Sequence, residues 1–401
     1  MKTLDSTLLV ISHKRHIVDP DNNNNVQVKG GFFALKNEFA KYFKQLILCV
    51  PVLYDSSVEK KQEYVSNISI SPLPWYETRG QFIRSLPKTI IRMARNINKA
   101  DLVYALTLND MGVLGMTVAK ILRKPFFISI GDNRAERVLT RQANPIVKIL
   151  KHLLIKLLLY SYIRVLASSH LAFVSGSVFM GHYRTWHPWV KTTILRRQMP
   201  DLVRPREWPP DHVMHVVFAG RVSPEKNIGT LIRAVEMLHH NNFPVRLTII
   251  GDGKLLKTYR EESELNDWRF ISFAGYIPNT ELLETRFLGA DVFILPSLEE
   301  QGAKVLSETR ACSIPLIASR VGGTPALVND GINGILFNPH SSAELAQKIM
   351  MVREDFSLRK KIVCNGYDFA KRHTLDSGIE KIIRLVSRFY SNSILQEQKR
   401  L

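Results

Sequence analysis

The stretch "PSLEEQGAKVLSETRAC", residues 296–312, begins at the end of one apolar segment, "ADVFILPS" (290–297), and is followed by another, "IPLIAS" (314–319). Short apolar segments of this kind predict buried strands, and the charged stretch between them predicts a loop followed by a helix. Strand, helix and strand in this order are typical of a parallel sheet that is wound with helices.

Two acids of this stretch, Glu300 and Glu308, stand eight positions apart around Gly302 and Lys304. On a helix, eight residues make about 2.2 turns. If the helix begins near Gly302, one acid lies in the loop before its N-terminus and the other on its inner face. Both acids could then reach one ligand.

The same rhythm of apolar strands and amphipathic helices runs through the whole second half of the chain. The predicted strands are 215–220, 245–253, 290–297 and 314–319, and the predicted helices are 227–240 and 341–354.

The first half repeats this alternation. Its predicted strands are 7–12, 44–50, 101–106 and 125–130, and its predicted helices are 30–43 and 111–124. The segment "DNNNNVQ" (21–27) predicts a polar loop between the first strand and Gly30. The expected fold class is therefore α/β, with two Rossmann-like, doubly wound domains that face a central cleft.

A Pro-rich stretch, "MPDLVRPREWPPDH" (199–212), interrupts the pattern and predicts a domain boundary. We expect an N-terminal domain over 1–198, a linker over 199–212 and a C-terminal domain over 213–375. The remaining residues, 376–401, predict a last helix, which could fold back across the cleft to the N-terminal domain, and a tail.

The composition is that of a globular protein, because 45% of the 401 residues are hydrophobic and 23% are charged. The opening stretch reads as a first strand, and no uncharged apolar run reaches the roughly 18 residues that a spanning helix needs. The three cysteines, Cys49, Cys312 and Cys364, lack CxxC spacing. Their number and spacing indicate a reduced cytosol instead of a disulfide framework or a zinc site.

The net charge of +19 lies almost entirely in the first half, where residues 1–200 hold 29 Lys and Arg against 12 Asp and Glu. Residues 137–200 contain ten Lys or Arg and no acid. A field of one sign attracts an anionic partner, such as a nucleic acid, a phospholipid surface or an acidic acceptor. No recognition helix, RNP-like segment or zinc spacing supports a nucleic acid.

Residues 146–166 predict one helix inside this acid-free region. Lys148, His152, Lys156, Tyr160 and Arg164 recur every four residues and form a narrow polar stripe beside a broad leucine-rich arc. This pattern suits a helix that lies in an anionic bilayer surface. It also suits a domain helix that buries its arc in the core and leaves the lysines solvated. The sequence leaves both interpretations open.

Two cations follow the predicted strand 215–220. In "FAGRVSPEKNIGTLIRA" (218–234), the strand ends at Gly220, and Arg221 and Lys226 lie in the loop before the next helix. Cations at such a place can hold a diphosphate, although two solvated loop cations would look the same. Glycine pairs stand next to further predicted helix starts, at Gly30 and Gly31 and at 322–323, and Gly251 belongs to a tight turn after a strand.

In combination, these motifs resemble glycosyltransferase family 4, the retaining sugar transferases of GT-B fold. The resemblance is carried by "FAGRVSPEKN", "IIGDG", "ADVFILPS", the Glu-x7-Glu of "EQGAKVLSE", "ACSIPLIASRVGGTPALVNDGINGILFNP" and "SSAELAQKI", in the family's order and spacing over about 160 residues. The first half matches more loosely, through "GGFFAL", "DLVYAL", "KPFFISIGDN" and "LAFVSGSVFMGHY".

The resemblance implies a role for each matching residue. Arg221 and Lys226 would bind the leaving diphosphate, Glu300 the hydroxyls of the donor sugar and Glu308 the ribose hydroxyls. Further donor-binding residues would be Gly30, Gly31, Gly220, Gly251, Gly302, Ala303, Lys304 and Val305.

The chain departs from the family pattern at several positions. Gln301 and Ser313 stand where the family has glycine, and Ala326 stands where it often has glutamate. After the strand 125–130, Asp132 lies near the place of a common histidine, where it either positions the acceptor or sugar, or caps the next helix. Lys304 either adds a cation near the phosphates or faces solvent.

The implied function is transfer of a sugar from a UDP- or GDP-sugar to a glycan or lipid-linked glycan acceptor, with retention of configuration, in surface polysaccharide or lipopolysaccharide synthesis. The resemblance implies no metal or other cofactor, because cations and helix amides would stabilise the leaving diphosphate. The alternatives are a non-catalytic GT-B subunit that binds a nucleotide-sugar for a partner transferase and, third, a GT-B epimerase. We expect a cytoplasmic protein whose residues 137–200 contact an anionic membrane surface.

Overall fold

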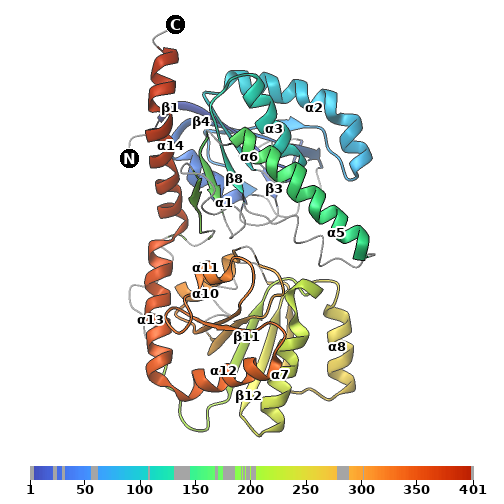
Figure 1. The fold of residues 1–401 in the computed structure, drawn as a ribbon, viewed down its shortest axis with the longest axis vertical. Coiled ribbons are helices and arrows are strands. Elements are labelled where there is room, and N and C mark those ends of the chain that lie inside the picture. The colour runs from blue at the N-terminus through green and yellow to red at the C-terminus, as the bar shows by residue number, and fades with distance from the viewer. Residues whose placement is uncertain are drawn as a thin grey trace. The chain divides into compact units, whose positions relative to one another are not determined.

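The structure is a computed structural model, and it describes residues 4–20, 25–28, 32–55, 62–106, 109–130, 145–167, 170–174, 186–190, 192, 195, 199, 205–277, 289–300 and 302–398. The chain forms two compact units (Figure 1). Unit 1 comprises Met1–Trp189 and Leu375–Leu401, and unit 2 comprises Val190–Thr374.

The described part of unit 1 builds a ten-stranded sheet in the order β10-β9-β8-β7-β1-β4-β2-β3-β5, with β6 paired to β4. The strands are β1 (Leu4–Ile11), β2 (His16–Val18), β3 (Asn25–Val28), β4 (Phe43–Tyr54), β5 (Gln62–Glu63), β6 (Ile68–Leu73), β7 (Leu102–Leu106), β8 (Phe126–Ile130), β9 (Ala172–Val174) and β10 (Trp186–Pro188). The four strands predicted in this half are β1, β4, β7 and β8.

The central strands of this sheet are parallel and largely buried, whereas the β2–β3–β5 edge is antiparallel. The polar segment 21–27, predicted as a loop, is in part a strand, because Asn25–Val28 forms β3 and pairs with β2. Val26 and Val28 are buried in this strand. Burial of these two apolar side chains favours a strand, although the neighbouring asparagines had predicted a loop.

Unit 1 has a layer of helices on each face of the sheet. Its helices are α1 (Phe32–Ala40), α2 (Arg79–Lys99), α3 (Asp110–Ile121), α5 (Pro145–Leu154), the π-helical η1 (Ile155–Tyr160), α6 (Ser161–Ala167) and α14 (Leu375–Gln398). The crossovers through α2, α3 and α5–α6 all lead in one direction across the sheet, so their right-handedness places them on one face. In agreement with this placement, α3 contacts both α2 and α6. The helices α1 and α14 pack with each other (Figure 1).

The last helix, α14, belongs to unit 1. The hydroxyl of Tyr390 on α14 donates a hydrogen bond to the backbone carbonyl of Phe126 at the start of β8. Ile379, Ile382, Ile383 and Val386 recur at helical spacing and are buried. An apolar stripe of this kind fixes a helix against a neighbouring layer.

Unit 2 is built on a parallel sheet of six described strands in the order β13-β12-β11-β14-β15-β16. The strands are β11 (Met214–Ala219), β12 (Val245–Ile250), β13 (Ile271–Gly275), β14 (Val292–Leu295), β15 (Leu316–Ser319) and β16 (Ile335–Phe337). Numbered within the unit, the order is 3-2-1-4-5-6, the order of doubly wound dinucleotide-binding folds.

The helices of unit 2 follow its strands. They are the 3-10 turn η3 (Pro224–Lys226), α7 (Ile228–His240), α8 (Leu256–Leu265), α10 (Lys304–Ala311), α11 (Thr324–Leu327), α12 (Ser342–Glu354) and α13 (Phe356–Arg372). Apolar residues of α7 and α12 recur at helical spacing and pack on the buried strands. The described part of the Pro-rich segment, 205–212, packs on this unit, where the guanidinium of Arg359 lies 3.9 Å from the ring centroid of Trp208.

Candidate functional site

The strand order of unit 2 reverses between β11 and β14. In open parallel sheets, ligands bind beyond the carboxyl ends of the strands at this reversal. The residues that follow β11 and β14 are therefore the first candidates for a site. They include Gly220, Arg221 and Lys226 after β11, and Glu300 and the start of α10 after β14.

Lys226 and Glu300 form the centre of this site. The Lys226 Nζ lies 2.6 Å from the Glu300 Oε2, and the two side chains are only 20% and 12% exposed. Ser297, at the end of β14, donates its hydroxyl to the same carboxylate at 3.4 Å and accepts from Lys226 at 3.5 Å. Half-burial strengthens such a charge pair relative to one in water, so both side chains are held in place.

The second predicted cation, Arg221, is placed differently. Its side chain is 73% exposed, and one guanidinium nitrogen lies 3.4 Å from the Glu225 Oε1. Burial disfavours the charged form of Glu225, but its backbone amide and the cations Arg221 and Lys226 outweigh this and lower the pKa of its carboxyl. The loop between β11 and α7 therefore carries two cations, one held inside the site and one at its rim.

The helix α10 begins at Lys304, two residues later than predicted from the sequence. Its N-cap residue, Ala303, makes no side-chain cap, and Gly302 before it has a φ of 125°, which favours glycine. Glu300 precedes the helix, and Glu308 is buried on it. Gly302, Ala303, Lys304 and Val305 are half-buried at this end. Uncapped amides at a helix N-terminus can bind a phosphate.

Gly251 and Gly253 support the site from β12. A Cβ at Gly251, which has a φ of 136°, would lie 1.8 Å from the carbonyl oxygen of Gly220, and one at Gly253 would lie 2.2 Å from that of Val222. The backbones of the two loops thus touch, and only glycine fits. The structure shows Gly251 as a backbone support of the Gly220–Val222 segment.

Asn227 is a structural centre of the site that the sequence analysis did not identify. It has a left-handed φ of 53° at the start of α7. Its amide nitrogen donates to the carbonyls of Pro296, after β14, and Pro339, after β16, at 3.1 and 2.8 Å. Asparagine tolerates this conformation better than most residues, and its position directly after Lys226 was the available signal.

A second support joins Glu300 to the Gly-Gly turn. The amide of Gly323 donates to the backbone carbonyl of Glu300 at 2.7 Å, and the hydroxyl of Ser319 donates to the carbonyl of Ser297 at 2.5 Å. These bonds tie the loop after β15 to the loop after β14. The glycine turn at 322–323 thus supports the backbone that carries the acid.

Arg310 fixes the far end of α10. It is buried, and it donates to the carbonyls of Leu327 and Asn333 at 2.9 and 3.2 Å, while its guanidinium lies 4.8 Å from the ring centroid of Phe369. Burial lowers the pKa of Arg310 to about 10. The contacts join α10 to the turn after α11 and to α13.

Three predicted site residues, Gly30, Gly31 and Asp132, lie outside the described residues. Within the described ranges, no group of three or more His, Cys, Asp and Glu side chains is arranged to hold a metal ion. The three cysteines are free thiols.

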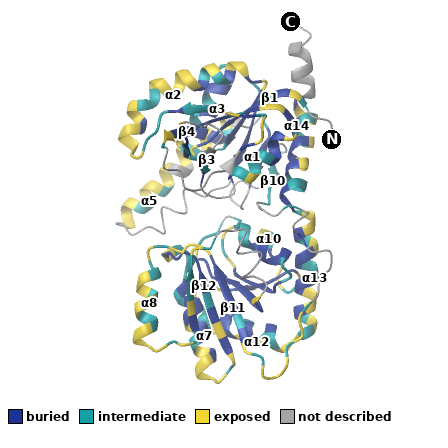
Figure 2. Cartoon of the chain, turned by 180° about the vertical axis from the view of Figure 1, so that it is seen from behind, coloured by how far each residue is buried: buried dark blue, intermediate teal, exposed yellow. Residues whose placement is uncertain are grey.

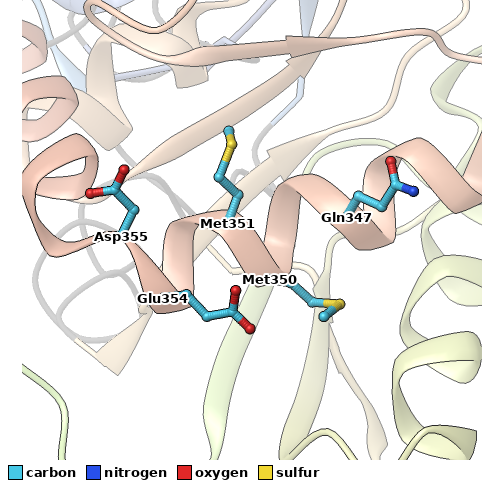
Figure 3. Close-up of a pocket in the computed structure, with 5 residues that line it drawn as sticks. All are labelled: Gln347, Met350, Met351, Glu354 and Asp355. Carbon is cyan, nitrogen blue, oxygen red and sulfur yellow. The ribbon is translucent and has the colours of Figure 1, made fainter.

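A surface pocket also lies on unit 2, at the C-terminal end of α12 (Figure 3). It is lined by Gln347, Met350, Met351, Glu354 and Asp355. Close by in sequence, Arg353 donates to the carbonyls of Pro209 and Pro210, which precede β11. The pocket therefore belongs to the amino-terminal edge of the sheet, opposite to the edge that carries Lys226 and Glu300.

Comparison with known proteins adds to this description. Residues 206–369 match the family described as Glycosyl transferases group 1. The chain is 31% identical over 175 residues to an uncharacterized glycosyltransferase of Methanocaldococcus jannaschii, across 43% of this chain and 48% of that protein. The chain thus spans about half the length of this curated relative.

Solved structures resemble the chain over nearly its whole length. The Anabaena protein HepE in complex with UDP has a TM-score of 0.67 at 18% identity, and 96% of this chain and all of that chain are covered. WaaG, a glycosyltransferase involved in lipopolysaccharide biosynthesis, has a TM-score of 0.60 at 14% identity, with 94% and 98% covered. The fold is therefore GT-B, with two Rossmann-like units, as predicted, and the match to Glycosyl transferases group 1 lies within unit 2.

Proposed function

We propose that the protein is a glycosyltransferase that moves a sugar from a nucleotide diphosphate sugar to a glycan or lipid-linked glycan. The observation that carries this proposal is the Lys226–Glu300 pair, 2.6 Å apart, beside the uncapped start of α10 at the strand-order reversal of unit 2. A half-buried cation, a set of amides and two acids within one site match the phosphates, sugar hydroxyls and ribose of such a donor.

Each residue has a distinct task in this proposal. Lys226 and the amides at the start of α10 bind the diphosphate, and Arg221 at the rim adds a second cation. The buried carboxylate of Glu308 accepts the ribose hydroxyls, since a carboxylate can accept from both hydroxyls of a diol. Glu300 accepts a hydroxyl of the donor sugar while it keeps Lys226 in position. Lys304, in the first turn, adds positive charge near the phosphates.

The reaction breaks the bond between the sugar's anomeric carbon and the phosphate oxygen, and the bond's electrons stay with the diphosphate. Positive charge that is already in place at the leaving group stabilises this negative charge as it develops. In our proposal, Lys226, Arg221 and the α10 amides supply that charge without a metal ion. The acceptor attacks from the face that the diphosphate leaves, with the departing phosphate as base, so the configuration is retained.

For the acceptor, we propose a glycan on a membrane-bound carrier in surface polysaccharide or lipopolysaccharide synthesis at the inner face of the cytoplasmic membrane. The fold neighbour WaaG acts in lipopolysaccharide biosynthesis, which supports this pathway. In the described residues, no helix is both long enough and apolar enough to cross a bilayer. Contact with the membrane would therefore be made from its surface.

The exposed face of α5 supports such a surface contact. None of its residues is buried, and Ile146, Leu150 and Leu153 are 75%, 58% and 56% exposed (Figure 2). Lys148 and His152 are less exposed than these apolar side chains. The interpretation in which the leucine-rich arc packs into the core is therefore wrong for α5. An exposed apolar helix face in a basic domain is suited to an anionic bilayer surface.

The donor proposal is tested by thermal unfolding with a panel of UDP- and GDP-sugars. We expect one sugar nucleotide to raise the melting temperature, because a ligand that binds only the folded state stabilises it. Glu308→Gln should weaken donor binding, so that at least about ten times more donor is needed for the same rise in melting temperature. The matched control, Glu261→Gln on the surface of α8, should leave the shift unchanged, since its carboxylate is 59% exposed.

Turnover separates catalysis from the binding alternative. A donor that raises the melting temperature and is also consumed in the presence of a membrane extract supports a transferase. A donor that binds without consumption would favour the non-catalytic subunit. If no sugar nucleotide shifts the wild-type melting temperature, the assignment of the site is wrong.

A further inference from the structure

The helix α2 has an unusual distribution of charge. Its 21 residues, Arg79–Lys99, contain six Lys or Arg and no acid. A capping box fixes its start, because the side chain of Thr78 accepts from the amide of Gln81 while that of Gln81 accepts from the amide of Thr78. The N-terminus of the helix is therefore fixed at Thr78.

The cations form one straight ridge. Five of them are exposed and recur at spacings of four, four, three and four residues: Arg84, Lys88, Arg92, Arg95 and Lys99. At 100° per residue, these positions fall within an arc of about 80°, and they extend over about 22 Å of helix. The buried residues Phe82, Thr89, Met93 and Ile97 lie on the opposite side. The centre of the ridge lies about 135° around the helix from the centre of the buried face, so most of the ridge is directed to solvent.

Apolar side chains flank one side of this ridge. Ile83 and Ile91 are 62% and 52% exposed, and Ile90 is 38% exposed. On the helical wheel they lie between the ridge and the buried face. A surface that only had to bind a soluble polyanion would not need exposed isoleucines beside its cations, whereas a bilayer interface accommodates both.

Local acids do not neutralise the ridge. In the parts of unit 1 that the structure describes, none of the five cations forms an ion pair with a carboxylate. Arg92 donates to the backbone carbonyl of Pro72, so it is partly held by the protein. Glu77 and Asp101 lie just beyond the two ends of the helix. The remaining four cations, Arg84, Lys88, Arg95 and Lys99, face outward without a protein anion.

We infer that α2 binds anionic lipid headgroups and is the electrostatic half of a membrane-docking surface whose apolar half is α5. The two helices belong to the same helical layer of unit 1, in which α3 contacts both α2 and α6. Figure 2 shows exposed residues along both α2 and α5. This inference rests on the surface contact proposed for α5, and it adds a second element, α2, whose cations bind the anionic headgroups of that surface.

The division of tasks has a physical reason. A short apolar helix face alone gives weak and reversible membrane binding, and stable attachment takes a second signal, such as a basic patch. A ridge of cations is attracted to anionic headgroups over about one Debye length. The α2 ridge would bring the protein to the surface, and the α5 side chains would then insert.

Flotation of the full chain with vesicles tests this inference. The vesicles contain either phosphatidylcholine alone or phosphatidylcholine with about one third phosphatidylglycerol. The test variant is Arg84→Gln, Lys88→Gln, Arg95→Gln and Lys99→Gln together, because glutamine keeps helix propensity while it removes the charge. The control removes four exposed cations from unit 2: Lys254→Gln, Lys360→Gln, Lys361→Gln and Lys371→Gln. Both variants lose the same net charge.

We expect the wild-type chain and the control to float with the anionic vesicles, and the α2 variant to bind them about 100-fold more weakly, with little remaining salt dependence. Equal weakening by both variants would show that net charge and not α2 is responsible, which overturns the inference. Binding of the α2 variant at wild-type strength would also overturn it, as would wild-type binding that is equal on neutral vesicles.

Two further measurements distinguish lipid binding by α2 from binding of a soluble polyanion and from the proposed transferase activity. A loss of retention on a heparin column by the α2 variant, with unchanged vesicle binding, would assign the ridge to a soluble polyanion and overturn the lipid assignment. Donor-induced melting shifts are measured on the same variants, and we expect them to match wild type. Absent shifts in all chains would contradict the transferase proposal and leave the flotation result as an independent test of α2.

Discussion

The ammonium of Lys226 and the carboxylate of Glu300 are 2.6 Å apart, although the two residues are 74 positions apart in the sequence. The cation expected at the diphosphate is therefore held by the acid expected at the donor sugar. This arrangement orders both groups at the site before a donor binds. Binding then requires little reorganisation of charge, as catalysis by preorganised groups demands.

The first prediction concerns the stability of this pair. Lys226→Ala leaves the half-buried Glu300 without its cation, and we expect a loss of about 1–3 kcal/mol in the free energy of unfolding, measured by urea titration. The control, Lys257→Ala, breaks a pair in which the lysine is 89% exposed, and it should cost less than about 0.5 kcal/mol. Equal losses in the two variants would contradict the strength assigned to the Lys226–Glu300 pair.

The second prediction concerns Ser313, which has a left-handed φ of 58° after α10. Glycine adopts this conformation without the steric cost that a Cβ brings, so Ser313→Gly should raise the free energy of unfolding by about 0.5–1 kcal/mol. Ser313→Ala is the control, because it removes the hydroxyl and keeps the Cβ. An increase of the same size with alanine would assign the effect to the buried hydroxyl instead of the backbone.

The third prediction concerns Gly251, whose Cβ would lie 1.8 Å from the Gly220 carbonyl oxygen. Gly251→Ala must displace one of the two loops, so we expect a loss of about 3 kcal/mol or more, together with weaker donor binding. Gly331→Ala is the matched control, because Gly331 also has a positive φ, 67°, but no atom within 4 Å of the added Cβ. It should cost only about 1 kcal/mol. Thermal and urea unfolding of both variants will show whether the difference exists.

The fourth prediction concerns Lys36, which is fully buried on α1 and whose Nζ has no hydrogen-bond partner among the described residues. Burial lowers the pKa of this amine well below its ordinary value. The rings of Phe32, Phe39 and Tyr104 lie within 5.2 Å of the Nζ and favour the cation. Loss of all hydration without a replacement acceptor outweighs them. Lys36→Met should therefore stabilise the protein by about 1–3 kcal/mol at pH 7.

The sign of the pH dependence follows from the two states. Burial lowers the pKa of Lys36 in the folded chain, whereas the unfolded chain has an ordinary lysine pKa near 10.4, so in the pH range between the two values the unfolded chain binds a proton that the folded chain does not. The resulting penalty on the wild-type fold decreases as the pH rises toward 10. The advantage of Lys36→Met should decrease with it in urea titrations at pH 7 and pH 9.5. A constant advantage would contradict the shift. Lys88→Met on α2 is the control and should show neither effect, because this lysine is exposed and forms no ion pair in the described part of the chain.

Sequence reasoning identified β11 and β14, which carry the site, and the neighbouring β12 and β15, because buried parallel strands are short apolar segments with a clear pattern. It did not identify α2, whose apolar positions are separated by six cations and a proline at position 87. It also took 21–27 for a loop, although Asn25–Val28 forms β3, in which Val26 and Val28 are buried. In both cases the polar residues concealed an apolar pattern that only packing against the sheet makes visible.

Within the site, the motif around 296–312 was enough to locate Glu300 before α10 and Glu308 on its inner face. The pairing of Glu300 with Lys226, the exposure of Arg221 and the bridging role of Asn227 were not visible in it. These depend on the distance between the ends of β11 and β14. That distance is a property of the strand order in the sheet, which local patterns do not contain.

The amino-acid order by itself determined that this chain alternates buried strands with amphipathic helices and that its cations are concentrated in the first half, because periodicity and charge are local properties. Only the tertiary structure decided which charged side chains form ion pairs, which remain exposed to solvent and which are buried and desolvated. Those outcomes depend on neighbours that are brought together through the sheet, as Lys226, the α2 ridge and Lys36 each show. Electrostatic energies change strongly with separation and burial, so residues with the same charge in the sequence have different roles in the fold.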